Sequence, residues 1–120
     1  MEIKNPNAFT IKRSSWLKGS GKETCILDYN GKRDCFGFLF QSANVPDAEL
    51  LKALEPGDIA RRHNWSANKL IEYGTVGFYQ TSLCNSIIKT NDANDIDEEI
   101  RESFLIELFA SIGITLSFID

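Results

Sequence analysis

The sequence has few of the residues that reactive and metal-binding centres use. It contains one histidine, His63, and three cysteines without a C-x-x-C spacing, which predicts neither a zinc site nor a disulfide framework. No apolar run approaches the ~20 residues of a membrane span, and residues 1–6 are polar where a signal peptide would be hydrophobic. An odd number of cysteines fits a reducing compartment. We therefore expect a cytoplasmic protein with no metal, no cofactor and no membrane contact.

Length and composition favour one globular domain. The chain has 120 residues, of which 42% are apolar and 25% are charged, the balance of an ordered protein. We predict a single domain over residues 1–120, with residues 1–22 the least ordered because they end in the flexible segment Gly19-Ser20-Gly21-Lys22. The net charge of −4 argues against direct nucleic-acid binding, since domains that bind nucleic acid are usually basic.

Acidic residues concentrate in one segment near the C-terminus. Residues 1–33 carry seven basic and three acidic side chains, whereas residues 34–120 carry six basic and fourteen acidic ones. Within residues 91–107 only Arg101 opposes the acidic side chains. Such a face suits a basic partner, either by direct docking or by imitating a phosphate backbone. The predicted partner-binding residues in this segment are Asp92, Asp95, Asp97, Glu98, Glu99 and Glu102.

Two smaller clusters combine cations with aromatic rings. Arginine and tryptophan dominate protein–protein hot spots, and they also suit phosphates and aromatic faces. Arg13 and Trp16 are therefore predicted to bind a ligand. A second set, in a polar segment without clear periodicity, is predicted to bind a partner, and an ordinary surface loop with an aromatic anchor is the alternative. This set consists of Arg61, Arg62, His63 and Trp65.

The first half of the chain predicts two strands and two short helices. Residues 8–12 and 24–29 alternate as strands do, and a turn at Asn30-Gly31 follows the second. Apolar residues at helical spacing predict a helix over 35–43, capped by Asp34.

A second short helix is predicted from Pro46 onward, stopped by Pro56-Gly57. It would present Leu50, Leu51 and Leu54 to the core. Further along, Val76–Gln80 reads as a strand, and residues 83–89 fit either a strand or one helical turn.

The last third gives the clearest pattern. Asp97 caps a predicted helix over 98–112, Gly113 ends it, and an alternating strand covers 114–119. The fold expected is α+β: a small, mainly antiparallel sheet packed against one long C-terminal helix, with two short helices in the middle. The residues expected to build the helix's core face are Ile100, Phe104, Leu105, Leu108, Phe109 and Ile112.

One pattern is spread over much of the chain: residues 31–39, Val45-Pro46-Asp47, Leu50-Leu51, Trp16 with Gly19, and Asn91-Asp92 before an acidic helix. This pattern resembles a family of small phage and prophage proteins of unknown function. Their hallmark is a strand, a glycine turn, and a motif of the type C-C-L-G-F or C-C-L-G-V that opens a helix. Where relatives often have two adjacent cysteines, this chain has Asp34-Cys35, which argues against a role needing two thiols. The resemblance implies a phage or mobile-element origin and no particular activity.

A second resemblance rests on three fragments, residues 34–38, 54–59 and 76–79. Together they resemble the NlpC/P60 cell-wall peptidases, in which the cysteine lies at a helix N-terminus. Thr75 occupies the position of the family's catalytic histidine, and a thiol without a base is a poor nucleophile at neutral pH. Cys35 is therefore interpreted as a small buried apolar residue rather than as a nucleophile.

These observations favour a non-catalytic phage or mobile-element accessory protein that binds a host protein in the host cytoplasm. The favoured consequence is inhibition of antiphage defence, as in anti-CRISPR-like inhibitors. Two alternatives stay open: a small-molecule or nucleotide-binding module, and a degenerate NlpC/P60-like thiol hydrolase.

Overall fold

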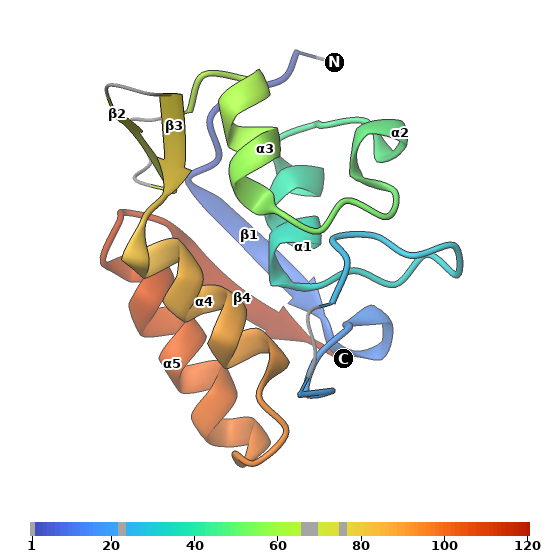
Figure 1. Ribbon diagram of the computed structural model, residues 1–120. Coiled ribbons are helices and arrows are strands. Elements are labelled where there is room, and N and C mark those ends of the chain that lie inside the picture. The colour runs from blue at the N-terminus through green and yellow to red at the C-terminus, as the bar shows by residue number, and fades with distance from the viewer. Residues whose placement is uncertain (1, 22–23, 66–69, 75–76) are drawn as a thin grey trace.

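The computed structural model describes residues 2–21, 24–65, 70–74 and 77–120. Its main layer is a pair of strands with helices on one side (Figure 1). In chain order the elements are β1 (Ala8–Lys12), the 3-10 turn η1 (Arg13–Ser15), α1 (Cys35–Ser42), α2 (Asp47–Leu50), α3 (Pro56–Arg62), β2 (Ile71–Gly74), β3 (Gly77–Gln80), α4 (Ser82–Asp92), α5 (Glu98–Ala110) and β4 (Thr115–Ile119).

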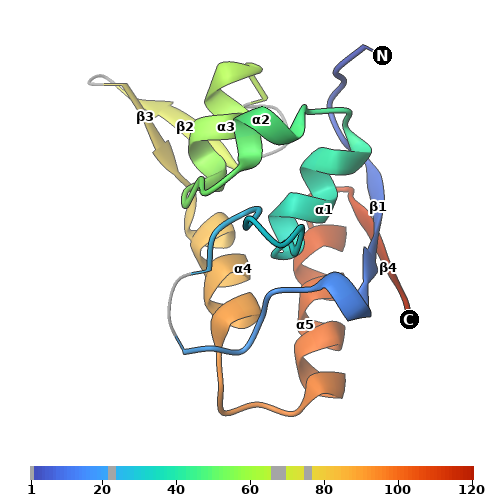
Figure 2. The ribbon, with the colours of Figure 1, turned by 90° about the vertical axis from the view of Figure 1, so that its right-hand side faces the viewer.

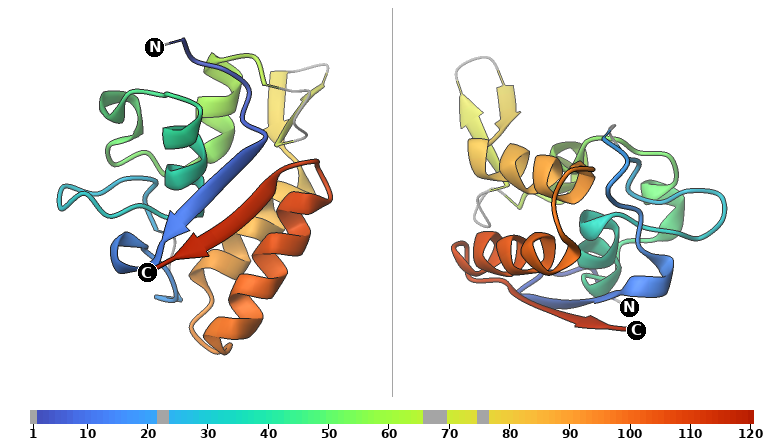
Figure 3. Two further views of the ribbon diagram at one scale, coloured as in Figure 1. Left: turned by 180° about the vertical axis from the view of Figure 1, so that it is seen from behind. Right: turned by 90° about the horizontal axis from the view of Figure 1, so that it is seen from below.

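The first and last strands pair in parallel. Phe9 lies opposite Leu116 and Ile11 opposite Phe118. Phe9, Ile11 and Leu116 are buried, because they face α1 and α5, which contact β1 and β4 respectively. The opposite face of the strand pair has no helix over it (Figure 3, left). One layer of helices therefore encloses the core against one side of a very small sheet.

Aromatic rings join the helices to this sheet. The ring of Phe109 on α5 lies edge-on to Phe9 of β1, with centroids 4.9 Å apart, and to Phe36 of α1 at 5.8 Å. Edge-to-face pairs add to the free energy that burial alone supplies. Phe109 is thus the point at which α1, α5 and β1 meet.

The predicted antiparallel sheet against one long helix is wrong. The described residues form an α+β fold with five α-helices, and in this part of the chain the β1–β4 sheet has two strands, which are parallel. Among the described residues the antiparallel pair is the separate β2–β3 hairpin. The predicted strand over 24–29 does not form: Leu27 makes only isolated bridges, and the consecutive residues Ile26 and Leu27 are both buried, which the alternation of a strand does not give.

Local signals at the start of α1 are confirmed. The Asp34 side chain accepts a hydrogen bond from the backbone N–H of Gly37 at 2.9 Å, which satisfies one of the unpaired donors of the first turn. Gly37 is required for packing, because a Cβ there would overlap the carbonyl oxygen of Ile26. The helix ends at Ser42, one residue before the predicted end.

The middle helices differ from the prediction. The second helix, α2, covers only Asp47–Leu50, and of its three predicted core leucines only Leu50 is buried, whereas Leu51 and Leu54 are exposed. Pro56 begins α3 instead of ending α2, because proline at the first helical position loses no hydrogen bond.

Residues 82–92 form a full helix, α4. The sequence pattern over residues 83–89 fitted either a strand or one helical turn and did not distinguish between them. Its first turn is capped by Thr81, whose hydroxyl accepts from the N–H of Cys84 at 3.2 Å. Most of its outer residues are polar, so the apolar period that identifies a helix is weak.

The C-terminal helix and strand form close to their predicted positions, although α5 ends at Ala110 rather than at residue 112 and β4 begins at Thr115. Asp97 precedes α5 without making a side-chain capping hydrogen bond, and the buried face of α5 is not the predicted one. Its inward residues are Arg101, Leu105 and Phe109, and Gly113 follows with a φ of +79°. Phe104, predicted to be in the core, is 50% exposed, and Ile100 is 44% exposed. The prediction that Phe104 is a core residue is therefore wrong.

Two substitutions on α5 should separate the core face from the outer face. Phe109→Ala removes a fully buried ring and is expected to cost about 3–5 kcal/mol of unfolding free energy. Phe104→Ala should cost less than about 1 kcal/mol, since half of that ring is already in water. Urea denaturation followed by circular dichroism measures both, and equal losses would contradict this assignment of faces.

Candidate binding surface

Asn91, at the end of α4, organises a buried polar cluster next to Cys35. Its Oδ1 accepts hydrogen bonds from Trp16 Nε1 at 2.8 Å and from the backbone N–H of Cys35 at 3.1 Å. Its Nδ2 donates to the carbonyl oxygen of Leu17 at 3.0 Å and to Asp92 Oδ1 at 2.9 Å. Asn91 is 1% exposed, so its amide is fully used in joining α4 to the N-terminal segment and to α1.

Cys35 lies inside this cluster with no exposed surface. Burial raises the pKa of its thiol well above the usual value, and the carboxyl groups of Asp34 and Asp92 raise it further. His63 is engaged elsewhere: its Nε2 lies 2.8 Å from Glu49 Oε2, and no hydrogen bond joins it to Cys35 within the described residues. The arrangement shields the thiol and keeps it protonated.

The carboxyl group of Asp34 is also perturbed. Its complete burial raises its pKa to about 8, although the hydrogen bond from Gly37 N–H opposes this shift, and the charge of Asp92 adds to it. Thr24 lies between the two carboxyl groups, with its hydroxyl donating to Asp92 Oδ1 at 2.8 Å. At neutral pH Asp34 is thus mainly protonated in the folded protein.

Arg101 faces inward from α5 and closes the end of α4. Its Nη1 donates to the carbonyl oxygens of Thr90 and Asn91 at 2.7 and 2.9 Å, and its Nη2 donates to that of Ala93 at 2.6 Å. These carbonyls would otherwise lack partners at the end of the helix. Arg101, the one cation within the acidic segment 91–107, is therefore 1% exposed, and its hydrogen bonds are made inside the protein.

The second predicted cluster of cations and aromatic rings does not form one surface. It consists of Arg61, Arg62, His63 and Trp65. Arg61 and Arg62 are exposed at the end of α3. His63 and Trp65 turn inward: the two rings lie 5.0 Å apart, and Trp65 stacks on Phe40 at 5.9 Å. Two of the four predicted partner-binding residues thus anchor α3 to the core, and two remain on the surface.

Arg13 and Trp16, the two residues predicted to bind a ligand, bond to other residues of this chain instead. Arg13 donates to both carboxylate oxygens of Glu102, at 2.9 and 2.8 Å, and to Asp120 Oδ1 at 3.0 Å. Trp16 is buried and its indole N–H is bonded to Asn91. Neither Arg13 nor Trp16 lines the cavity between α4 and α5 or the one formed by residues 4–8 and 42–43.

Only part of the predicted acidic face is available to a partner. Asp92 is buried, Glu98 pairs with Lys18 and Arg101, and Glu102 pairs with Arg13. Within the acidic segment, four exposed carboxylates take part in no ion pair with another described residue. They are Asp95, Asp97, Glu99 and Glu107.

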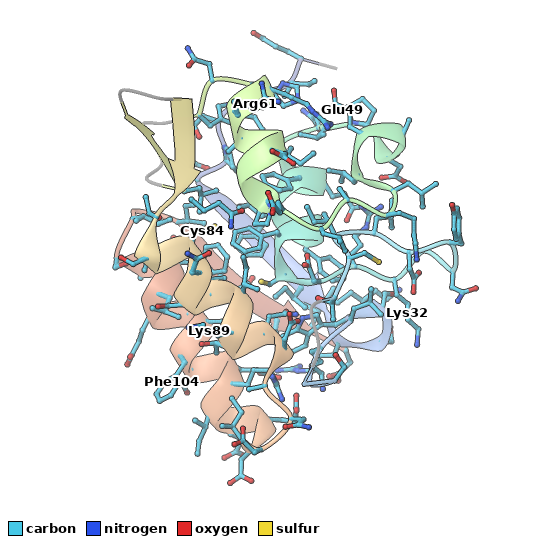
Figure 4. The ribbon with its side chains drawn as sticks, in the orientation of Figure 1. Lys32, Glu49, Arg61, Cys84, Lys89 and Phe104 are labelled. Atoms are coloured by element: carbon cyan, nitrogen blue, oxygen red, sulfur yellow. The ribbon has the colours of Figure 1, made fainter. Side chains whose placement is uncertain are left out.

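An open groove of about 310 Å³ runs between α4 and α5. Phe104 lies on the outer side of α5 (Figure 4) and forms one wall of this groove, which we call the α4–α5 groove. The groove was not predicted from the sequence, because the spacing of Phe104 along the helix also fits a core position. A signal was present, since the six apolar residues assigned to one stripe cover more of the helix circumference than one contact needs. The groove is lined by Ser86, Thr90, Phe104, Glu107, Leu108 and Ser111.

Comparison with known proteins returns nothing similar. No protein-family model, no curated protein and no solved structure matches the chain. Among the described residues, no helix combines the length and hydrophobicity that crossing a bilayer requires. Function must therefore be argued from the surface itself.

Replacing Asp34 by asparagine should change how stability depends on pH. Because the folded pKa is about 8 and the unfolded one is about 3.9, the folded state holds more protons between these values, and stability falls as the pH rises through this window. Asp34→Asn keeps an acceptor for Gly37 N–H and cannot ionise. At pH 9 the variant should be more stable by roughly 2–5 kcal/mol, measured by urea denaturation. A variant less stable than the parent at pH 9 would contradict the assigned shift.

Iodoacetamide labelling of the folded protein at pH 7 should discriminate among the three thiols. Cys25 is partly exposed, whereas Cys35 and Cys84 are buried. We expect Cys25 to be modified first and the other two only after unfolding, because a buried thiol with a raised pKa is unreactive. Mass spectrometry of tryptic peptides measures the order in which the three cysteines are modified. Fast, selective labelling of Cys35 would instead support the thiol hydrolase.

Proposed function

We propose that the protein is a non-catalytic protein-binding module and that the outer side of α5, with the α4–α5 groove, is its binding surface. The observation that carries this proposal is the exposure of Phe104 and Ile100 on a helix whose inward side is already filled by Leu105 and Phe109. Large exposed apolar side chains grouped beside a groove mark interaction sites. Aromatic anchors of this kind supply much of the affinity in protein interfaces.

One of the unpaired carboxylates, Glu107, lines the α4–α5 groove, and the other three lie near the start of α5. Glu99 and Glu107 are on α5, and Asp95 and Asp97 immediately precede it. Charges around an apolar centre accelerate association with an oppositely charged partner and disfavour other partners. The acidic segment predicted from the sequence thus keeps its proposed role, carried by fewer residues.

The partner class follows from the resemblance to phage and prophage proteins. It supports a host protein as the partner, with inhibition of antiphage defence as the consequence, in the host cytoplasm. The nucleotide-binding alternative has weaker support, because Trp16 and Trp65 are buried and the groove is lined by a carboxylate without a cation. The shielded Cys35 likewise gives little support to a thiol hydrolase.

Affinity purification with paired variants tests the proposal. The tagged protein should recover one dominant host protein, and Phe104→Ser should reduce that recovery at least tenfold, the loss expected for an aromatic anchor. Leu54→Ser is the matched control, since Leu54 is also 50% exposed but lies before α3 and outside the groove. Circular dichroism confirms that both variants are folded. Equal recovery by the two variants, or an empty purification in several host extracts, would overturn the proposal.

A further inference from the structure

The outer edge of β4 presents backbone groups that make no hydrogen bond with the rest of the described chain. The N–H of Thr115 donates to the carbonyl oxygen of Asn7 at 3.0 Å, in the register that pairs β4 with β1. Successive residues of a strand direct their peptide groups to opposite sides, so those of Leu116 and Phe118 point away from β1. No described residue bonds to these N–H and C=O groups. The edge of β4 therefore has room for one more strand.

The residues of β4 do not oppose the addition of a strand. Soluble proteins commonly protect a free sheet edge with a lysine, a proline or a bulge. The segment Thr115–Ile119 contains no charged residue and no proline, and its register with β1 runs from end to end without a bulge. The neighbouring strand β1, in contrast, ends in Lys12. Of the two edges of this sheet, that of β4 is therefore the less protected.

Helix α5 forms a shelf beneath this edge. The helices lie on one side of the strand pair (Figure 2), and α5 lies on the side of β4 that is away from β1 (Figures 1 and 3). Glu102 of α5 pairs with Arg13, which directly follows β1, so this flank of α5 faces the strands. Ile106 is one turn further along the same flank and is 40% exposed. A strand added to β4 would lie over α5 and cover Ile106.

From these observations we infer that the outer edge of β4 binds an extended segment of a partner protein by strand addition. The segment runs antiparallel to β4, the more stable direction, and exchanges backbone hydrogen bonds with Leu116 and Phe118. Its apolar side chains, at alternate positions, lie over α5 against Ile106. None of the residues that line the α4–α5 groove is on β4, so this is a second binding surface, beyond the one in the proposed function.

A second copy of this chain is a poorer occupant of the edge. Antiparallel pairing of two β4 strands requires a two-fold axis perpendicular to the sheet, which places both α5 helices on the same side. The two strands would be about 4.8 Å apart, whereas packed helices need about 8–10 Å between their axes. Because each α5 already lies beyond its own β4, the two helices would occupy the same space. An extended segment without a helix of its own avoids this overlap.

Peptides that differ only in the position of N-methyl groups test the inference. The parent peptide has seven residues, with valine at positions 3 and 5, threonine at positions 2, 4 and 6, and lysine at both ends. When the valines lie over α5, their N–H groups face β4 and those of the threonines face solvent. Methylating both valine nitrogens should therefore raise the Kd at least tenfold. Methylating the nitrogens of threonines 4 and 6 is the matched control and should leave the Kd within about twofold. Fluorescence anisotropy with labelled peptides measures all three.

Amide exchange and one pair of variants locate the bound peptide on the full chain. The parent peptide should slow exchange of the Leu116 and Phe118 N–H groups at least tenfold, with little change at Ser117, whose N–H faces β1. Ile106→Ser should weaken binding at least threefold. Leu54→Ser is the matched control, because Leu54 is exposed to a similar extent and lies outside β4 and α5. Circular dichroism confirms that both variants are folded.

Four results would each overturn the inference. They are equal affinity of the two methylated peptides, exchange slowed only at α4–α5 groove residues, equal binding by the two variants, and no binding at a peptide concentration of about 1 mM. Sedimentation of the chain alone examines the other occupant. A dimer in which the Phe118 N–H is already protected from exchange would assign the edge to a second copy and would also overturn the inference.

Discussion

The guanidinium of Arg101 is the interaction on which the arrangement of the helices depends. It donates to three carbonyl oxygens at the end of α4, where a positive charge also interacts favourably with the helix dipole. Asn91, at that same helix end, binds Trp16, Leu17 and Cys35. A buried polar group is stable only when it is fully hydrogen-bonded, so these two side chains fix the N-terminal segment, α4 and α5 together (Figure 2).

This constraint also determines what α5 exposes. Because Arg101 must point toward α4, the buried stripe continues through Leu105 and Phe109 at intervals of four residues. Ile100 and Phe104 each precede a stripe residue by one position, which places them about 100° around the helix. Their exposure therefore follows from a contact made inside the protein. The proposed binding surface and the buried contacts of Arg101 lie on different sides of α5, and both follow from the orientation of this helix.

The sequence predicts the elements whose signals are local. The Asp34 cap, the position of α5, the turn at Gly113 and β4 can all be recognised within a few residues. The parallel pairing of β1 with β4 cannot, because it joins the two ends of the chain and leaves no mark on either strand. The orientation of α5 was missed for a related reason: hydrophobic periodicity counts Arg101 as polar surface, whereas carbonyls of α4 make it a core residue. The acidic part of the candidate site was found from composition alone, and Phe104 was not.

Ion pairs cancel part of the charge of the chain. Three cations of the N-terminal third pair with carboxylates elsewhere in the chain: Arg13 with Glu102, Lys18 with Glu98, and Arg33 with Asp47. Exposed pairs of this kind contribute only about 0–1 kcal/mol each, so their main effect is to cancel charge. Of the unpaired carboxylates on α5, Glu107 lies in the groove beside the exposed ring of Phe104. In protein interfaces apolar contact supplies affinity, and unpaired charge supplies orientation and choice of partner. The proposed binding surface offers both on one helix, whose orientation is set by contacts inside the protein.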